Sequence, residues 1–209
     1  MPANLLSGNY QKKCIKGSKF LSSLDQDWNS LVSSVGPCKL NLSIELEPYQ
    51  ALIKSVIFQQ LRPASATAIF NRFKQNFDNN FPTEEKILAS PESKLKESGL
   101  SFNKRKTIIE IARHVQKGEL ENRQDFLMMN DSQIIEKLTK IKGIGEWTAQ
   151  MLMIFNLGKL DVFPAGDFAL RKNYSLFKSI ASPLTMRELS KISEEWKPFR
   201  SIAAWYLWR

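Results

Sequence analysis

The chain has few of the residues that build metal centres. It contains two cysteines, Cys14 and Cys38, and a single histidine, His114. Two cysteines cannot by themselves form a four-ligand zinc site or hold an iron–sulfur cluster. Two cysteines in 209 residues do not make a disulfide framework either. We therefore expect no iron–sulfur cluster and a reducing, intracellular setting.

Long apolar runs are also missing. Every apolar stretch is interrupted by polar residues before it reaches the length that crosses a bilayer, so no membrane partner is expected. The first residues have neither a basic start nor a long apolar run, which argues against a signal peptide. The expected location is the cytoplasm or nucleoid of a prokaryote, or the nucleus of a eukaryote.

Acidic residues are outnumbered by basic ones. The sequence has 30 Lys and Arg against 21 Asp and Glu, which gives a formal net charge of +9. A basic chain is typical of proteins whose partner is a polyanion, most often a nucleic acid. A basic surface that only maintains solubility explains the charge equally well, so composition leaves both interpretations open.

The apolar spacing predicts helices nearly everywhere. Apolar residues recur at intervals of three and four, and no alternating run is long enough to indicate a sheet. The expected class is all-α, a packed array of helices rather than a long bundle. The expected helix boundaries are Pro48 to Arg62-Pro63, Ser90-Pro91 to Gly99, a start at Asp131 or Ser132, Glu146 to Leu157, a capping box from Thr185 to Glu188, and Phe199 to Trp208.

Two predicted helices are joined by a short glycine-containing turn. The stretch from Leu138 to Ala149 reads LTKIKGIGEWTA, with the turn at Lys142-Gly143-Ile144-Gly145. Glycine permits positive φ and lets another backbone approach closely. The N–H groups that begin the second helix, together with its dipole, form a phosphate site. The motif is a helix-hairpin-helix, which anchors the DNA backbone without reading sequence; a plain αα-corner is the structural alternative.

A carboxylate follows the second helix of this hairpin. Asp167 comes after the turn-forming Pro164-Ala165-Gly166, where another helix is expected to begin. It can serve as an N-cap, and the N–H groups of a helix start favour a negative charge. A fixed carboxylate beside a sugar C1′ can stabilise oxocarbenium charge or orient a water molecule. Asp161, the other acid in this segment, is interpreted as structural.

These stretches resemble the helix-hairpin-helix base-excision DNA glycosylases, and within them the 3-methyladenine DNA glycosylase II (AlkA-type) branch. The hairpin and Asp167 carry the resemblance, with three supporting segments. These segments are Ile57-Phe58-Gln59-Gln60-Leu61, the loop from Gly99 to Lys106, and the C-terminal stretch from Trp196 to Trp208. The resemblance covers residues 45–209. It implies an N-terminal arm or peripheral helix over 1–45 and a glycosylase domain over 46–209. The implied fold is a compact two-lobed helical array with an active-site cleft between the lobes, with one lobe at 50–160 and a second from the N-terminus plus 165–209.

The resemblance also implies roles for individual residues. Asp167 matches the catalytic Asp, and Gln60 or Leu61 matches the wedge that fills the gap left by a flipped base. Trp147, Met151 and Trp208 match positions that line the base pocket. The residues expected to bind DNA phosphate are Lys142, Gly143, Ile144, Gly145 and Thr148. The backbone carbonyls of Thr139, Ile141 and Ile144 match the ligands of a monovalent cation, and Lys104, Arg105 and Lys106 are expected to form a solvated turn that contacts phosphates.

One departure from the wider superfamily bears on the reaction. Strand-cutting members carry a Lys two residues after the second hairpin Gly, and this position is Trp147 here. Without that nucleophile, the resemblance implies a monomeric, monofunctional hydrolase that releases alkylated purines such as 3-methyladenine and 7-methylguanine from duplex DNA. Two alternatives stay open: a glycosylase of the same fold for another lesion, such as ethenoadenine, hypoxanthine or an oxidised base, and a non-catalytic binder of DNA structure.

Overall fold

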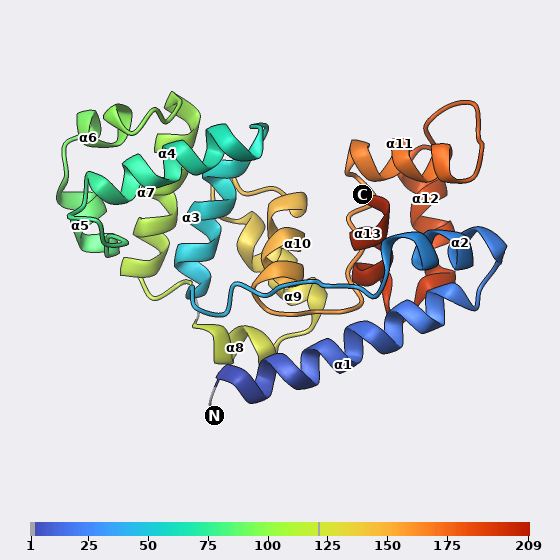
Figure 1. The fold of residues 1–209 in the computed structure, drawn as a ribbon. Coiled ribbons are helices and arrows are strands. Elements are labelled where there is room, and N and C mark those ends of the chain that lie inside the picture. Colours follow the sequence, from blue (N-terminus) through green and yellow to red (C-terminus); the bar gives the residue numbers. More distant parts are fainter. Residues whose placement is uncertain (1–2, 121) are drawn as a thin grey trace. The chain divides into compact units, whose positions relative to one another are not determined.

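All regular structure in the described part of the chain is helical, as the sequence predicts. The computed structural model describes residues 3–120 and 122–209 and divides into two units (Figure 1). The terminal unit comprises Met1–Leu42 and Met153–Arg209, and the central unit comprises Ser43–Leu152. None of the helices in the described ranges is long and apolar enough to cross a membrane.

The central unit is a cluster of helices around an aliphatic and phenylalanine core. Its helices are α3 (Pro48–Phe58), α4 (Pro63–Gln75), α5 (Glu84–Ala89), α6 (Glu92–Glu97), α7 (Phe102–Gln116), α8 (Arg123–Met128), α9 (Asp131–Thr139) and most of α10 (Glu146–Phe155). Helix α7 packs against both α3 and α5, and α3 also packs against α4 (Figure 1). Helix α3 is buried along its apolar face, including Leu52, Ile53 and Val56. This face holds α3 and α7 together and fixes where the end of α3 lies.

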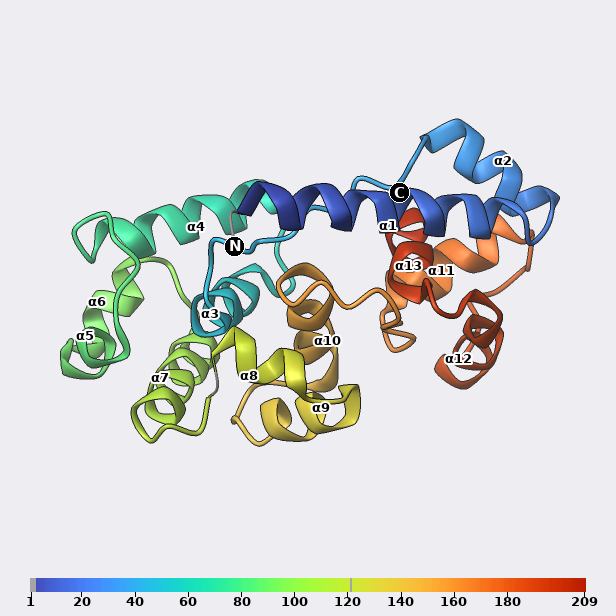
Figure 2. The same ribbon diagram turned by 90° about the horizontal axis from the view of Figure 1, so that it is seen from below.

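The terminal unit combines the two ends of the chain. Its helices are α1 (Ala3–Ser22), α2 (Gln26–Val35), α11 (Phe168–Phe177), α12 (Met186–Ser193), the 3₁₀ turn η1 (Glu194–Trp196) and α13 (Arg200–Leu207). Helix α1 packs on α2 and α13, and α11 packs on α13 (Figure 2). Trp28 and Trp196 are buried and meet edge to face with ring centroids 5.4 Å apart. The segment predicted as an arm or peripheral helix thus contains α1 and α2.

Helix boundaries follow local capping chemistry, with two corrections. Helix α3 ends at Phe58, before the predicted end at Arg62-Pro63, and Gln60 in the turn that follows has a positive φ. Pro48 and Pro63 each occupy the first turn of a helix, and Thr185 and Glu188 form the predicted capping box of α12. The predicted cap of α9 at Asp131 or Ser132 is wrong. Asn130 is the cap, because its side chain accepts from the Gln133 N–H while the Gln133 side chain accepts from the Asn130 N–H.

The two cysteines are buried together in the terminal unit. The Ser18 hydroxyl donates to the Cys14 carbonyl at 3.0 Å and accepts from the Cys38 N–H at 2.9 Å, so it ties their backbones together. Both residues are at most 1% exposed. The hydrogen bond with Cys14 and burial raise the pKa of the Cys38 thiol, which disfavours the reactive thiolate.

Native protein is therefore expected to resist thiol modification. Cys14 and Cys38 should react with an aromatic disulfide reagent at least about 100-fold more slowly in buffer than in denaturing urea, because modification requires local unfolding. The rate of thiolate release, followed by absorbance, measures this protection. Rapid labelling of either residue in the native protein would contradict the packing described.

Candidate functional site

The hairpin joins α9 to α10 in the central unit. Ile141 and Ile144 are buried and pack its turn, whereas Lys142, Gly143 and Gly145 are exposed. The Ile144 N–H donates to the Ile141 carbonyl at 2.9 Å, which closes the turn. The exposed glycines precede the first turn of α10, whose N–H groups have no acceptor earlier in the helix. This is the geometry that suits a phosphate at a helix start.

Gly143 is constrained both by its backbone and by its neighbours. Its φ is +94°, in the region that favours glycine. A Cβ atom added there would lie 2.0 Å from the Thr107 hydroxyl oxygen on α7. The hairpin turn thus sits directly on α7, and only a residue without a side chain fits. A Cβ atom added at Gly145 would have no neighbouring atom within 4 Å. Packing within the chain therefore does not require a glycine at this position.

The structure narrows the predicted role of Thr148. Its side chain is 2% exposed, and its hydroxyl accepts a hydrogen bond from the Gln59 amide at 2.8 Å. The side chain therefore faces the protein interior, and a phosphate contact by this residue can come only from its backbone N–H. The same bond ties the segment that contains the predicted wedge to α10.

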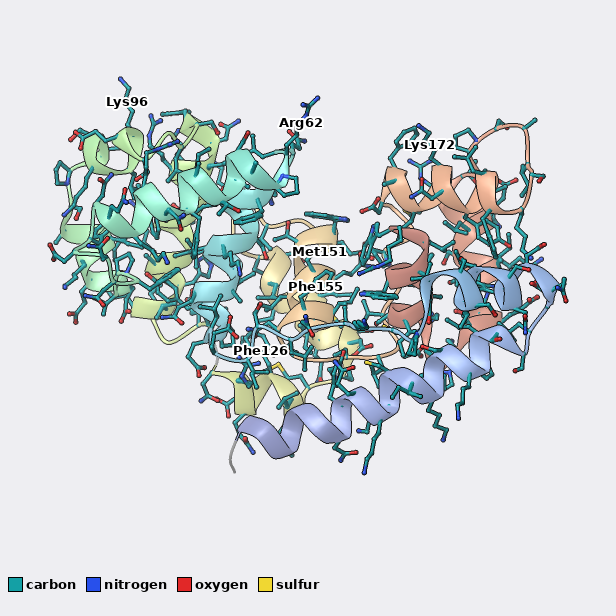
Figure 3. The ribbon with its side chains drawn as sticks, viewed as in Figure 1. Arg62, Lys96, Phe126, Met151, Phe155 and Lys172 are labelled. Atoms are coloured by element: carbon teal, nitrogen blue, oxygen red, sulfur yellow. The ribbon has the colours of Figure 1, made fainter. Side chains whose placement is uncertain are left out.

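The predicted wedge residues lie in the turn between α3 and α4. Gln60 has a φ of +54°, which is uncommon for a residue with a side chain, and it is exposed. Leu61 is 37% exposed. Arg62 follows at the cap of α4 and projects into solvent (Figure 3). An exposed apolar side chain at the tip of a strained turn suits insertion into a base stack.

The predicted turn at residues 104–106 is wrong for all three residues, and its predicted solvation is wrong for Lys104 and Arg105. All three lie in the first part of α7. The Lys104 ammonium donates to the carbonyls of Ile57 and Gln59, and Arg105 pairs with Glu92 at 2.9 Å. Only Lys106 is exposed, with its ammonium 4.2 Å from the centroid of the Phe102 ring. Packing of α7 against α3 converts Lys104 from a surface charge into an internal contact.

Asp167 caps α11, the position that the sequence predicts. One carboxylate oxygen accepts from the N–H groups of Ala169 at 2.8 Å and Leu170 at 3.2 Å. These bonds fix the side chain at the helix start, where the dipole favours negative charge. Asp161 is structural, as predicted, because both of its carboxylate oxygens accept from the Arg200 guanidinium at 2.8 and 3.1 Å.

Two exposed apolar side chains beside Asp167 were not predicted from the sequence. Phe168 is 60% exposed and Met186 is 58% exposed. The Met186 sulfur packs against Gly166, and the Arg171 guanidinium lies 5.4 Å from the centroid of the Phe168 ring. Large exposed apolar groups that flank a carboxylate are candidates for contact with a ligand. The spacing of residues along the sequence could not predict that Met186 lies near Asp167, because Met186 belongs to a different helix.

The predicted base-pocket residues lie on α10 and at the end of α13. Trp147 is 38% exposed, and Met151 follows four residues later on the same helix face. Phe155 continues this face (Figure 3). The structure adds Phe155 to the candidate set because its ring stacks on the Trp208 ring, with the two centroids 5.8 Å apart. Asn173 of α11 donates to the Leu207 carbonyl at 2.7 Å, which holds the end of α13 against α11. Trp205 is buried.

The carbonyls predicted to hold a monovalent cation belong to the hairpin. The Ile141 carbonyl already accepts the Ile144 N–H, which leaves it one lone pair. The Thr139 hydroxyl donates to the Ile135 carbonyl at 2.8 Å. Carbonyl oxygens suit a hard cation. The cation site stays a prediction.

Comparison with known proteins identifies the family. The chain is 40% identical over 196 residues to DNA-3-methyladenine glycosylase 1 of Schizosaccharomyces pombe, and the match covers 93% of this chain and 86% of that protein. It is 37% identical over 196 residues to the alkylbase DNA glycosidase-like protein mag2 of the same organism, and this match covers 93% of this chain and 92% of mag2. The solved structure of the S. pombe 3-methyladenine DNA glycosylase Mag1 in complex with abasic DNA matches with a TM-score of 0.87 at 39% identity, and the match covers 92% of this chain and 95% of that one. Residues 53–198 match the family described as HhH-GPD superfamily base excision DNA repair protein, and the chain belongs to that family.

Proposed function

We propose that this chain is a monofunctional DNA glycosylase that hydrolyses the N-glycosidic bond of alkylated purines in duplex DNA. The observation that carries the proposal is Asp167, a carboxylate held by two backbone N–H groups at a helix start. The similarity to a protein named DNA-3-methyladenine glycosylase 1 over 93% of this chain supports the substrate class. We further propose that the protein acts as a monomer inside the cell.

The chemistry needs few catalytic groups. A purine alkylated at N3 or N7 carries a positive charge and leaves readily, so no second carboxyl group has to protonate it. The nucleotide first leaves the stack, at a cost of a few kcal/mol. The Asp167 carboxylate then stabilises the oxocarbenium charge or orients the attacking water. The exposed face of Trp147 offers a cationic base an attraction of about 0.5–2 kcal/mol.

Trp147 also bears on what the enzyme leaves behind. A Schiff base with the abasic sugar requires an amine, and an indole cannot form one. The product is therefore an intact strand with an abasic site. Base release and the absence of strand cleavage are therefore two separate predictions.

The test is release of free base from defined duplexes. Separate duplexes that contain 7-methylguanine, 3-methyladenine, ethenoadenine or hypoxanthine are incubated with the protein, and free base is measured by chromatography. We expect release of the two methylated purines, and strand breaks only after alkali treatment. Strand cleavage without alkali contradicts the monofunctional assignment, and release of ethenoadenine or hypoxanthine alone indicates another lesion class.

A non-catalytic DNA-binding role is the outcome to be excluded. One relative of comparable identity is named only as glycosidase-like. Binding to a duplex that contains a tetrahydrofuran abasic analogue, without release of any base, would assign this chain to that role. In such a role the Asp167 carboxylate would serve only as the cap of α11.

A further inference from the structure

The turn formed by residues 59–61, here called the wedge turn, is held from two sides within the central unit. Helix α3 ends at Phe58, and the chain then passes through Gln59 and Gln60 to reach α4 at Pro63. The Leu61 N–H makes a long bond of 3.4 Å to the Phe58 carbonyl, so the turn itself contributes little hydrogen bonding. Gln60 has a positive φ, and a residue with a side chain keeps that conformation only when its surroundings hold it there.

Lys104 supplies the first contact. Its ammonium donates to the Ile57 carbonyl at 2.8 Å and to the Gln59 carbonyl at 2.9 Å. The last carbonyls of a helix lack partners within the helix, and a cation at that end also interacts favourably with the helix dipole. Partial burial lowers the pKa of Lys104, which is the expected effect of moving an ammonium group out of water. Lys104 is thus committed to the turn rather than to solvent.

Gln59 supplies the second contact. Its amide donates to the buried hydroxyl of Thr148 at 2.8 Å, in the first turn of α10. Thr148 lies three residues after Gly145, so the wedge turn is connected directly to the helix that begins at the hairpin. Thr107, one helical turn after Lys104 on α7, supports Gly143 of the same hairpin. Helix α7 therefore contacts both the wedge turn and the hairpin.

We propose that Lys104 and Gln59 are positioning residues that fix the 59–61 turn, so that Leu61 and Gln60 are presented to DNA in register with the hairpin. The inference rests on the proposed function. Neither residue takes part in bond cleavage. They contribute to base flipping. A wedge that already has a fixed conformation can fill the vacated stack without paying the entropic cost of becoming ordered on binding.

The test compares Lys104→Met with Lys117→Met. Both substitutions remove one positive charge from the same helix, but Lys117 is exposed at the C-terminal end of α7 and has no assigned role in DNA binding. If Lys104 positions the wedge, Lys104→Met lowers the single-turnover rate on a 7-methylguanine duplex by about tenfold, as expected for the loss of hydrogen bonds from a charged donor. Lys117→Met should change that rate less than about twofold, since it removes only a solvated charge.

Substrate context separates positioning from general damage. When the same 7-methylguanine lies in an unpaired bubble, flipping costs less, and the defect of Lys104→Met should shrink to less than about threefold. Lys104→Arg, which can still donate to both carbonyls, should recover most of the rate. An equal loss on duplex and bubble, or no rescue by arginine, would overturn the proposal.

A second readout does not depend on catalysis. In a duplex with 2-aminopurine next to a tetrahydrofuran site, insertion of the wedge changes the probe's stacking and its fluorescence. Lys104→Met should reduce that change, whereas Lys117→Met should leave it intact. A wild-type protein that shows the fluorescence change but releases no base would refute the proposed function and not the positioning role. Gln59→Met, which removes only the bond to Thr148, provides the same test if Lys104→Met does not fold; an unchanged signal in that variant counts against the proposal.

Discussion

Asp167→Asn is expected to slow the release of 7-methylguanine by about 10³-fold or more, equivalent to about 4 kcal/mol of transition-state stabilisation. Asparagine caps helices about as well as aspartate, so α11 should still form. The amide oxygen can accept the same N–H groups of Ala169 and Leu170 that the carboxylate accepts now. The substitution thus removes the negative charge and little else, which isolates its electrostatic contribution.

Single-turnover kinetics and DNA binding together check this result. The affinity of Asp167→Asn for a tetrahydrofuran duplex, measured by fluorescence anisotropy, should stay within about threefold of wild type, since the hairpin is untouched. Asp161→Asn is the matched control because its carboxylate pairs with Arg200. It should cost about 1 kcal/mol of stability and leave the release rate within about threefold. Base release that survives in Asp167→Asn would contradict the mechanism.

Gly143→Ala is expected to damage both the fold and DNA binding. The new Cβ would lie 2.0 Å from the Thr107 hydroxyl oxygen and 2.9 Å from the Thr107 Cβ. Thr107 is buried, short and branched, so it cannot swing away. The clash and the strain of an alanine at a φ of +94° together should lower the free energy of unfolding by about 2–4 kcal/mol. The turn must then move off α7, which we expect to lower the affinity for duplex DNA by roughly 10–100-fold.

Gly145→Ala separates packing from DNA contact. It should leave the thermal unfolding temperature unchanged, because no atom lies within 4 Å of the added Cβ, whereas Gly143→Ala should lower it by roughly 5–10 °C. A loss of DNA affinity in Gly145→Ala at unchanged stability would report the close approach of a phosphate. Thr107→Ala combined with Gly143→Ala should recover part of the stability. Unchanged stability and affinity in Gly143→Ala would show that the hairpin does not depend on α7.

Much of the fold and some of the site were predictable because their signals are local. Apolar spacing, prolines at Pro48 and Pro63 and the capping box at Thr185 define helices through interactions within a few residues of one another. Asp167 was predictable for the same reason, since an N-cap bonds to N–H groups two and three residues later. The misplaced start of α9 was a choice among adjacent capping residues, all of which are chemically suitable.

Contacts between distant segments were decided only by the tertiary structure. Sequence alone placed Lys104 and Arg105 on a solvated turn, yet Lys104 bonds to carbonyls 47 and 45 residues away. The Thr148 hydroxyl similarly accepts from Gln59, 89 residues earlier, so only the backbone N–H of Thr148 can contact a phosphate. Such bonds depend on which helix faces pack together, and neither periodicity nor capping encodes that choice. The sequence by itself therefore determined the hairpin, the carboxylate and the helical class, whereas the packing of α3, α7 and α10 determined how the wedge turn is held.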